Sequence, residues 1–383
     1  MQNEELHWLA LRMSSGVGAR KALRLVEIFR TPQAIFRASK DELEEAGLSA
    51  AVAQSVASGC SFDEAVDQQE KAAKLGVQLI AVTDSRYPER LREIFDPPLL
   101  LYCRGRVELL QHLMLGVVGT RRPTPYGAQV ATRLSKDLSE AGLTIASGMA
   151  RGIDTAAHKA VIEAGGDTVA VFGCGVDEVY PAENRNLAES IAEKGLLVSE
   201  FPMGAPPFPQ NFPVRNRIIS GMSAGIVVIE GGEYSGSTIT AKLAAEQNRE
   251  MFAVPGNVTN KMSWGPNLLI KQGAKLVQQW NDIVTELKPE DRRRLVDQAR
   301  KRLDLNEKSK DESADGSPAS LISGSDRAIL SALKHDAPVN LDSLHDSFPE
   351  TSLSEMMATL FELEMGGLIR QMPGKSYIKV WAE

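Results

Sequence analysis

The stretch Leu115-Gly116-Val117-Val118-Gly119-Thr120-Arg121-Arg122 is an apolar run that ends in a glycine turn followed by two arginines. Uninterrupted apolar runs of this length are typical of buried parallel strands. The same pattern recurs and predicts strands at Leu115–Gly119, Leu143–Ser147, Thr168–Phe172, Leu196–Glu200, Gly225–Glu230 and Glu250–Val254. Helical segments lie between them, for example Gly127–Ala141 and Thr238–Asn248. This alternation predicts a doubly wound α/β sheet.

Glycine-punctuated turns follow several of these predicted strands. They are Gly119-Thr120-Arg121-Arg122, Ser147-Gly148-Met149-Ala150-Arg151-Gly152, Gly173-Cys174-Gly175 and Ser235-Gly236-Ser237-Thr238. Such turns present backbone N–H groups and a positive helix end to an anion. Several of them along one sheet edge, three beside arginine or lysine, indicate a groove for a string of phosphates. The pattern therefore predicts a nucleic-acid strand as the ligand.

The first two turns supply specific candidate contacts. We expect Arg121 to clamp a phosphate above the helix that follows the first strand. After the second strand, Ser147 and the amides of Gly148 and Met149 can donate to phosphate oxygens. Arg151 adds a positive charge at the same edge.

Two further helix starts carry candidates. The segment Asn211-Phe212-Pro213-Val214-Arg215-Asn216-Arg217 places cations where a helix dipole disfavours them. Arg215 and Arg217 therefore either meet a ligand or pair with local acids such as Glu200. After the fifth strand, Ser235-Gly236-Ser237-Thr238 predicts an anion cradle, with Lys242 about one turn further on.

Two phenylalanines near the helix start at Asn211–Arg217 have alternative interpretations. Phe208 and Phe212, if exposed, can stack on bases. For Phe212, packing in the core is the favoured interpretation.

Composition limits the class of protein. The chain of 383 residues has 43% hydrophobic and 24% charged residues, as soluble globular proteins do. Its net charge of -7 argues against indiscriminate coating of nucleic acid and requires any groove to be a local feature. The three cysteines form no CxxC pair, which predicts neither a zinc site nor a disulfide framework. The N-terminal sequence lacks a signal peptide and no stretch suits a membrane span, so we expect a cytoplasmic protein.

The chain divides by pattern into four parts: residues 1–62, 63–288, 289–322 and 323–383. The first reads as short helices around Ser15-Gly16-Val17-Gly18, which resembles a helix-hairpin-helix turn. Such a turn either meets a phosphate or is a plain helical turn that needs glycine. In the second part, residues 63–110 read as a connector with some strand content before the α/β region. The third part is charged and then small and polar, which indicates a linker.

The last part, residues 323–383, predicts a winged helix. Apolar spacing indicates three helices, and Gly366–Arg370 with Tyr377–Val380 indicate a short hairpin. The region Ser352–Met357, before and within the predicted third helix, contains no arginine or lysine. Recognition helices normally use cations or amides to contact DNA, so we expect a protein-contact module.

Three motifs typical of enzymes lack the secondary structure or the neighbouring residues that the corresponding sites need. Gly221-Met222-Ser223-Ala224-Gly225 matches a nucleophile elbow, but a helix precedes it and a strand follows, so we interpret it as a helix stop. Gly374-Lys375-Ser376 lacks the upstream glycine of a phosphate-binding loop. The turn at Gly173 has Glu178 where a dinucleotide fingerprint needs glycine. No catalytic residue, metal or cofactor is predicted.

Two polar residues in the helix after the second turn are predicted to be structural. His158 has no visible serine or cysteine partner, and we expect it to be hydrogen-bonded in the fold. Asp154 is expected to cap that helix or to pair with Arg151.

The segments together resemble the DNA-processing protein A (DprA, also called Smf) family. The matching residues are Gly119-Thr120-Arg121, Ser147–His158, Tyr180-Pro181, Ser199-Glu200, Phe212–Ser220, Ser235–Thr238, Val254-Pro255-Gly256 and Asn267–Ile270. The resemblance implies an extended Rossmann-like core that dimerises, with SAM or helix-hairpin-helix-like and winged-helix accessory domains. It also implies a single-stranded DNA-binding protein without catalytic turnover. Such proteins protect incoming DNA and help to load the RecA recombinase during natural transformation, the competence route to DNA recombination.

By motif match, the resemblance places Arg121, Ser147, Gly148, Arg151 and Asn216 in the DNA groove. Some relatives carry a lysine shortly before the Phe-Pro-x-Arg-Asn-Arg segment, whereas residues 206–211 here contain no cation. The predicted DNA-binding residues are Gly119, Arg121, Ser147, Gly148, Arg151, Arg215, Asn216, Arg217, Ser235, Gly236, Ser237 and Lys242.

An enzyme is the main alternative. The core is similar to nucleotide phosphoribohydrolases, which carry a Pro-Gly-Gly-x-Gly-Thr turn followed by a glutamate. The corresponding stretch, Glu230–Thr238, is longer and lacks the proline. A sequence-specific regulator that reads DNA through the winged helix is a third interpretation, which the acidic recognition segment disfavours. The residues therefore favour a binding protein over an enzyme.

Overall fold

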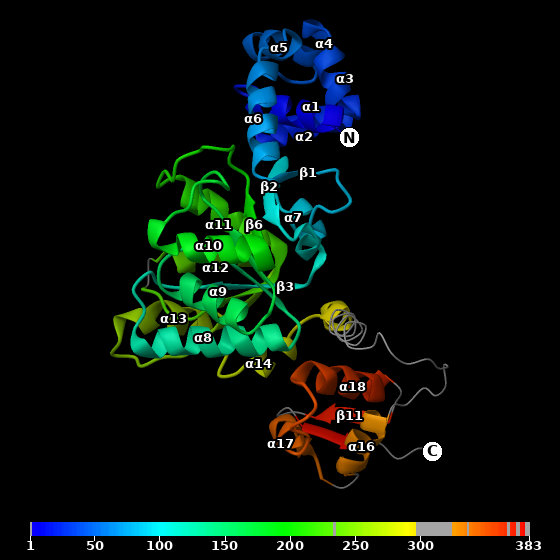
Figure 1. Ribbon diagram of the computed structural model, residues 1–383, viewed down its shortest axis with the longest axis vertical. Coiled ribbons are helices and arrows are strands. Elements are labelled where there is room, and N and C mark those ends of the chain that lie inside the picture. The colour runs from blue at the N-terminus through cyan, green and yellow to red at the C-terminus, as the bar shows by residue number, and fades with distance from the viewer. Residues whose placement is uncertain are drawn as a thin grey trace.

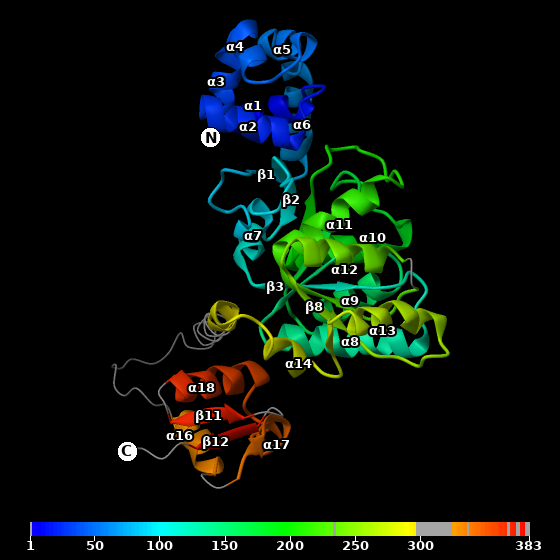
Figure 2. The same cartoon turned by 180° about the vertical axis from the view of Figure 1, so that it is seen from behind.

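The computed structural model describes residues 2–232, 235–295, 324–334, 337–365, 368–372 and 376–379. Figures 1 and 2 show a bundle of helices at one end, a central α/β body, and a small winged-helix part at the other end. Most of the predicted linker, residues 296–322, lies outside the described residues, as do Gly374 and Lys375. Within the described ranges, no helix combines the length and the apolar character needed to cross a bilayer.

One mixed sheet of nine strands forms the centre of the molecule. Its order is β1-β2-β6-β5-β4-β3-β7-β8-β9. The strands are β1 (Gln78–Ala81), β2 (Leu100–Gly105), β3 (Met114–Val118), β4 (Thr144–Ser147), β5 (Thr168–Val171), β6 (Leu196–Ser199), β7 (Ser223–Val228), β8 (Glu250–Ala253) and β9 (Lys275–Leu276). The seven neighbours β6, β5, β4, β3, β7, β8 and β9 are parallel to one another. Strands β2 and β1 add an antiparallel edge beside β6. The six predicted central strands are confirmed, and the segment expected to be a connector also contributes two strands to the same sheet.

The apolar sequence of the central strands is explained by their burial. Every residue of β3, β4, β5, β6 and β7 is buried, because helices cover both faces of this part of the sheet. Residue Gly116 in β3 pairs with Ala146 of β4 on one side and with Ile226 of β7 on the other. The chain order reverses between β3 and β7, which makes this junction the switch point of the sheet. Ligands of open α/β sheets bind outside the strand ends at such a point.

Six helices flank the parallel strands: α8 (Pro125–Glu140), α9 (Ile153–Glu163), α10 (Arg185–Lys194), α11 (Asn211–Met222), α12 (Gly236–Glu246) and α13 (Trp264–Lys271). Helices α8, α9 and α10 pack side by side, and α11 packs on α12. Right-handed crossovers that run in opposite directions from the switch point place these two sets on opposite faces. The N-termini of α8, α9, α11 and α12 therefore all lie at the carboxyl edge of the sheet.

The N-terminal helices are α1 (Gln2–Met13), α2 (Ala19–Phe29), α3 (Pro32–Arg37), α4 (Lys40–Glu45), α5 (Ala50–Ala57) and α6 (Phe62–Lys74). Gly16 and Gly47 have φ of 81° and 100° in the turns before α2 and α5, conformations that favour glycine. Helix α6 packs against α1, and β1 begins four residues after α6 ends. We therefore propose that the boundary between the helical part and the α/β part falls after α6 rather than at residue 62, where the sequence pattern placed it.

The C-terminal part contains α16 (Gly324–Ala332), β10 (Val339–Asn340), α17 (Leu341–Asp346), α18 (Leu353–Met365), β11 (Ile369–Met372) and β12 (Ser376–Lys379). Its three strands form a separate antiparallel sheet in the order β10-β12-β11. Three helices and a strand hairpin in this order form a winged helix, as predicted. Two short helices lie outside these groups: α7 (Glu89–Arg92) lies between β1 and β2 of the nine-stranded sheet, and α14 (Asn281–Val284) follows β9.

Candidate nucleic-acid interface

A cavity of about 780 Å³ lies at the switch point, outside the carboxyl ends of the parallel strands. The loop after β3 and the first turns of α11 and α12 line it, together with Tyr180 from the segment after β5. Gly119 lies in its wall, where a Cβ atom would be 2.4 Å from Ile153 Cγ1. The glycine is therefore required for the close approach of the β3 loop to α9.

The described charged residues that line the cavity are predominantly cationic. They are Arg121, Arg122, Arg215 and Asp154. Arg121 and Arg122 are exposed, whereas Arg215 and Asp154 are buried. A local excess of positive charge is thus present on a chain whose net charge is -7. This excess attracts a polyanion to the cavity.

The first turn of α12 forms the part of the wall that suits an anion best. Ser235 caps the helix by accepting a hydrogen bond from the Thr238 amide at 3.4 Å, and its hydroxyl lies 2.7 Å from that of Ser237. Gly236 is exposed, and a Cβ atom there would meet nothing within 4 Å. The first amides of an α-helix have no acceptor within the helix, so those of Gly236 and Ser237 are suited to an anion. Lys242 is exposed on the same helix but does not line the cavity, contrary to its predicted place.

An aromatic platform lies beside these donors. The ring of Phe212 is half-buried in the cavity wall, with its centroid 5.5 Å from that of Tyr180. The guanidinium carbon of Arg121 lies 5.6 Å from the Phe212 centroid. The favoured prediction that Phe212 packs in the core is therefore wrong. Phe208 is 51% exposed, which satisfies the condition set for base stacking.

Arg215 is held by the protein itself. Its Nη1 donates to the Gly148 carbonyl oxygen at 2.7 Å and to that of Val171, and its Nε donates to Asn216 Oδ1 at 3.2 Å. Burial lowers the pKa of Arg215 to about 10, while the nearby Asp154 carboxylate opposes the shift. Arg215 therefore joins the carboxyl ends of β4 and β5 and adds positive charge to the cavity wall. Asn216 lies beside it and also lines the cavity.

Asp154 occupies the turn after β4. Its Oδ2 accepts hydrogen bonds from the amides of Gly148 at 3.1 Å and Ala150 at 3.3 Å. Burial raises the pKa of Asp154 to about 6, and the Arg215 guanidinium opposes this rise. The carboxylate thus occupies a position predicted for a phosphate, and the Gly148 amide is not free for DNA. One predicted alternative was an ion pair between Asp154 and Arg151, and the structure does not contain this pair.

Two other predicted contacts in this turn are also engaged within the protein. Ser147 is fully buried, and its hydroxyl donates to the Val117 carbonyl oxygen at 2.6 Å, so it does not face the cavity. Arg151 is exposed but does not line the cavity. Its guanidinium forms a bidentate pair with Glu183 at 2.9 and 3.0 Å. The positive charge predicted here is therefore largely balanced.

The sequence left open whether Arg217 meets a ligand or pairs with local acids, and the structure shows the ion pairs. Arg217 is buried and pairs with Glu200 at 2.5 Å and with Asp96 at 3.1 Å. It does not line the cavity, because it lies on the side of α11 that faces these acids. The prediction of Arg217 as a DNA contact is corrected accordingly.

The motifs excluded as catalytic have structural roles. Helix α11 ends at Met222, and the Ser223 hydroxyl donates to the Ile219 carbonyl oxygen at 2.7 Å, which confirms a helix stop. His158 is fully buried, with Nδ1 2.7 Å from Thr168 Oγ1. Burial lowers the pKa of His158 to about 3, so the ring is neutral. The Thr168 hydroxyl donates to Ile145, which leaves it to accept from Nδ1.

Sequence reasoning missed two residues of the cavity wall as contacts. Arg122 adjoins a predicted contact, so its position in the turn was an available signal. Tyr180 follows β5 at a distance, and only the folded chain brings it to Phe212. Among the described residues, no group of histidine, cysteine and acidic side chains is arranged to hold a metal ion.

The fold and the cavity define a doubly wound α/β protein with a predominantly cationic cavity at its switch point. Family models make the assignment specific. The chain belongs to the DNA recombination-mediator protein A family, whose model matches residues 78–288. A DprA winged helix domain matches residues 312–375, and a SAM-like helix-hairpin-helix tandem matches residues 10–60. The predicted family and fold class are both confirmed.

Individual relatives agree with this assignment. The chain is 45% identical to the DNA processing protein DprA of Bacillus subtilis over 55% of its own length and 72% of that protein. It is 32% identical to Protein Smf of Synechocystis sp. over 98% of both chains. The likeness to the latter thus includes both accessory parts as well as the central body.

Two solved structures share the fold. The crystal structure of DprA from Streptococcus pneumoniae aligns with a TM-score of 0.67 and 34% identity, covering 74% of this chain and 98% of that one. DNA processing protein A from Helicobacter pylori aligns with a TM-score of 0.50 and 29% identity, covering 55% of this chain and 98% of that one. The latter structure is described as showing a single-stranded DNA binding mode.

Proposed function

We propose that this protein binds single-stranded DNA without catalytic turnover, protects incoming strands and helps to load the RecA recombinase in natural transformation. The observation that carries the proposal is the cationic cavity at the switch point, with a helix N-terminus and an aromatic platform in its wall. The single-stranded DNA binding mode described for the Helicobacter pylori relative supports the same ligand.

The geometry suggests how a strand is held. Phosphates meet the first amides of α12 and the exposed guanidinium groups of Arg121 and Arg122, while bases stack on Phe212 and Phe208. In this arrangement the helix amides and guanidinium groups contact the phosphate backbone and the rings contact base faces, so binding is nearly independent of sequence. Because the contacts are largely ionic, affinity falls steeply as salt rises.

We propose a narrower set of contacts than the sequence predicted. The residues that keep a place at the cavity are Gly119, Arg121, Arg215, Asn216, Ser235, Gly236 and Ser237. Ser147, Gly148, Arg151 and Arg217 instead act in the fold, because none of the four lines the cavity and each is bonded within the protein.

The proposal also includes a homodimer formed through the Rossmann-like body. The outer edge of the sheet at β9 carries a patch of exposed apolar side chains, with Val258 77%, Trp264 49% and Leu276 39% exposed. These residues line one shallow cavity beside the edge strand. Exposed apolar residues beside an unpaired strand edge are typical of a surface that a second chain covers.

Filter binding at moderate salt tests the choice of ligand. We expect a single-stranded oligonucleotide to bind more tightly than the matched duplex, because a stiff, wide double helix cannot bring its phosphates and bases into a cavity of about 780 Å³. Equal or tighter binding of the duplex would contradict the proposal. Mobility shifts of the same strand with and without RecA test the loading role, and a ternary complex is expected.

Incubation with nucleoside monophosphates tests the absence of turnover. We expect no release of free base. Release that depends on the folded protein would support the phosphoribohydrolase alternative and overturn the binding-only function.

A further inference from the structure

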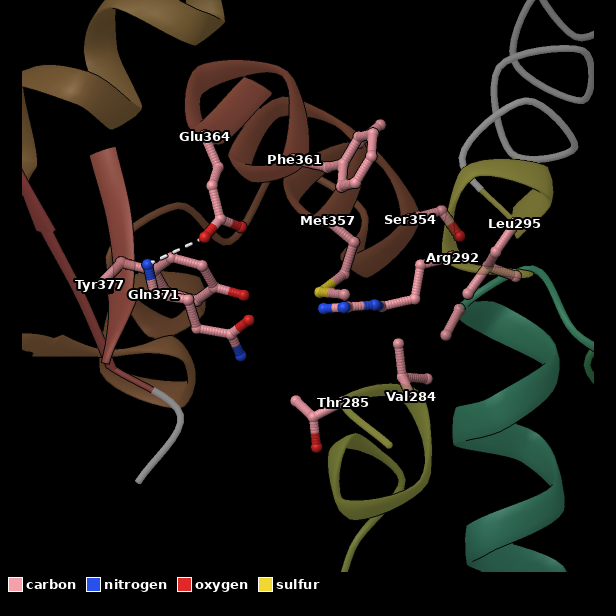
Figure 3. A pocket seen from close by; sticks show the side chains of 12 residues that line it. Val284, Thr285, Arg292, Leu295, Ser354, Met357, Phe361, Glu364, Gln371 and Tyr377 are labelled. Carbon is pink, nitrogen blue, oxygen red and sulfur yellow. Dashed lines mark hydrogen bonds between the residues drawn. The ribbon is translucent and has the colours of Figure 1, made fainter. Parts of the chain in front are cut away.

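The winged helix is attached to the central body through one face of its third helix, α18. The Ser354 hydroxyl, in the first turn of α18, donates to the Glu140 carbonyl oxygen at the C-terminus of α8. Figure 3 shows Met357, one turn further along, directed toward Arg292 of the segment that follows α14. Three segments far apart in sequence therefore meet at this contact, which we call the α18 seam.

The α18 seam is closely packed. On the central body it is formed by Val284 and Leu295, which are 1% and 4% exposed, and by Ala141. The space left between the two sides is a cavity of about 40 Å³, which is room for little more than water. One hydrophobic cluster runs from the central body into the winged helix, where it includes Met356 and Leu360. The winged helix thus contacts the central body through an apolar, closely packed surface.

The helix covered by this contact is the one that would read DNA. In helix-turn-helix proteins, the second helix of the motif enters the major groove and its first residues touch base edges. Helix α18 follows α17 in that position, and its first turns carry Ser354 and Met357 in the α18 seam. From Leu353 to Met365 the sequence contains three glutamates and no arginine or lysine. Both its position and its charge make α18 unsuited to a DNA groove.

We infer that the first turns of α18 form a protein-docking surface whose occupant is the α/β body of the same chain, so that the winged helix is stored with its groove-reading helix covered. The α18 seam involves no nucleic acid, so this inference does not depend on the proposed DNA-binding role of the cavity. An outside protein that used this face of α18 would have to displace the body first.

Cross-linking of the full chain tests the inference. Cysteines are introduced as Glu140→Cys and Ser354→Cys in a Cys60→Ser background, because Cys60 is exposed while Cys103 and Cys174 are buried. A short bismaleimide should then yield a product with the mobility of a single chain in the absence of DNA. No product, or a product joining only two chains, would overturn the intramolecular contact.

Two variants on opposite sides of the seam make the test specific. Met357→Lys, which puts a second cation beside Arg292, and Leu295→Asp each place an unpaired charge in the seam, and each should slow the cross-linking about tenfold. Ser343→Lys and Ser343→Asp add the same charges at an exposed position of α17 and should leave the rate unchanged. Thermal melting confirms that each variant is folded. If both seam variants cross-link at the parental rate, the docking surface is elsewhere.

Discussion

Arg215 and Arg217 show that the partners of a side chain depend on the fold. The two residues are two positions apart at the start of α11, and both are buried. Positions two apart on a helix point in nearly opposite directions. Arg215 therefore faces the carboxyl ends of β4 and β5 and the cavity, while Arg217 faces Glu200 and Asp96. The sequence indicated both outcomes for the pair but did not assign them.

Arg121→Ala is expected to weaken binding of all single-stranded sequences by about tenfold, because the loss of one phosphate contact does not depend on the base. Arg121 is exposed, so the melting temperature should change little. Fluorescence anisotropy with dT, dA and dC oligonucleotides measures the effect. Arg133→Ala on α8 removes an arginine that is 82% exposed and outside the cavity, and serves as the control. An unchanged dissociation constant for Arg121→Ala would remove it from the site.

Because Asp154 lies in the cavity wall and titrates, we expect the affinity for single-stranded DNA to depend on pH. Burial raises its pKa to about 6, so the carboxyl loses its negative charge as the pH falls through that value. A bound polyanion favours the protonated form, and by linkage affinity must then rise as pH falls from 7.5 to 5.5. We expect an increase of roughly threefold to tenfold. Oligo-dT is the suitable ligand because thymine does not titrate in this window.

Asp154→Asn provides the control for this pH effect. The amide oxygen can still accept from Gly148 and Ala150, but the side chain no longer titrates. Its affinity for oligo-dT should therefore be flat over the same range. If the variant shows the parental pH dependence, another group is responsible.

At the scale of elements, two helix starts that look alike in sequence behave differently. The start of α9 is preceded by a glycine-rich turn, but Asp154 of that same helix fills the turn with a carboxylate. At the start of α12, the described side-chain contacts near the first amides are made by the hydroxyl groups of Ser235, Ser237 and Thr238. A carboxylate and a phosphate compete for the same donors, so the second helix is the better anion site. Sequence located both helix starts, but the identity of the occupant depends on how the turn folds.

Gly236→Asp separates the stability of α12 from its role in binding. A carboxylate in the first turn favours the helix dipole by about 0.3–1 kcal/mol, so the melting temperature should hold or rise slightly. The same charge repels phosphate, and affinity for single-stranded DNA should fall about tenfold. There is room for the side chain, since a Cβ atom meets nothing within 4 Å. Gly236→Asn, similar in shape but neutral, should bind nearly as the parent does; an equal loss for both variants would point to shape rather than charge.

At the scale of the whole molecule, the nine-stranded sheet has two unlike edges. Strands β1 and β2 extend one edge, next to the N-terminal helices, while β9 ends the other and, among the described strands, pairs with β8 alone. The apolar patch around Trp264 lies at this second edge. A dimer formed there would leave the switch-point cavity of each chain open, because that cavity lies at the strand ends rather than along the edge.

Leu276→Lys is expected to shift the protein from dimer to monomer in sedimentation velocity at micromolar concentration. A charge in the middle of an apolar interface loses its hydration, which typically costs a few kcal/mol. Ile28→Lys on α2, where the parent side chain is 49% exposed, makes the same change away from the patch and should remain dimeric. A parent chain that sediments as a monomer, or a Leu276→Lys variant that stays dimeric, would contradict the proposed interface.

The sequence by itself determined the strands, the helices between them and the edge at which their glycine turns gather. These features follow from local rules: apolar runs must be buried, and the turns after parallel strands all fall on one side of a sheet. Only the tertiary structure decided that Ser147 donates to Val117, that Arg151 pairs with Glu183, and that Phe212 meets Tyr180 at the cavity. Each of these outcomes depends on a partner far away in the chain, and a buried polar group takes whichever partner the packing brings within reach.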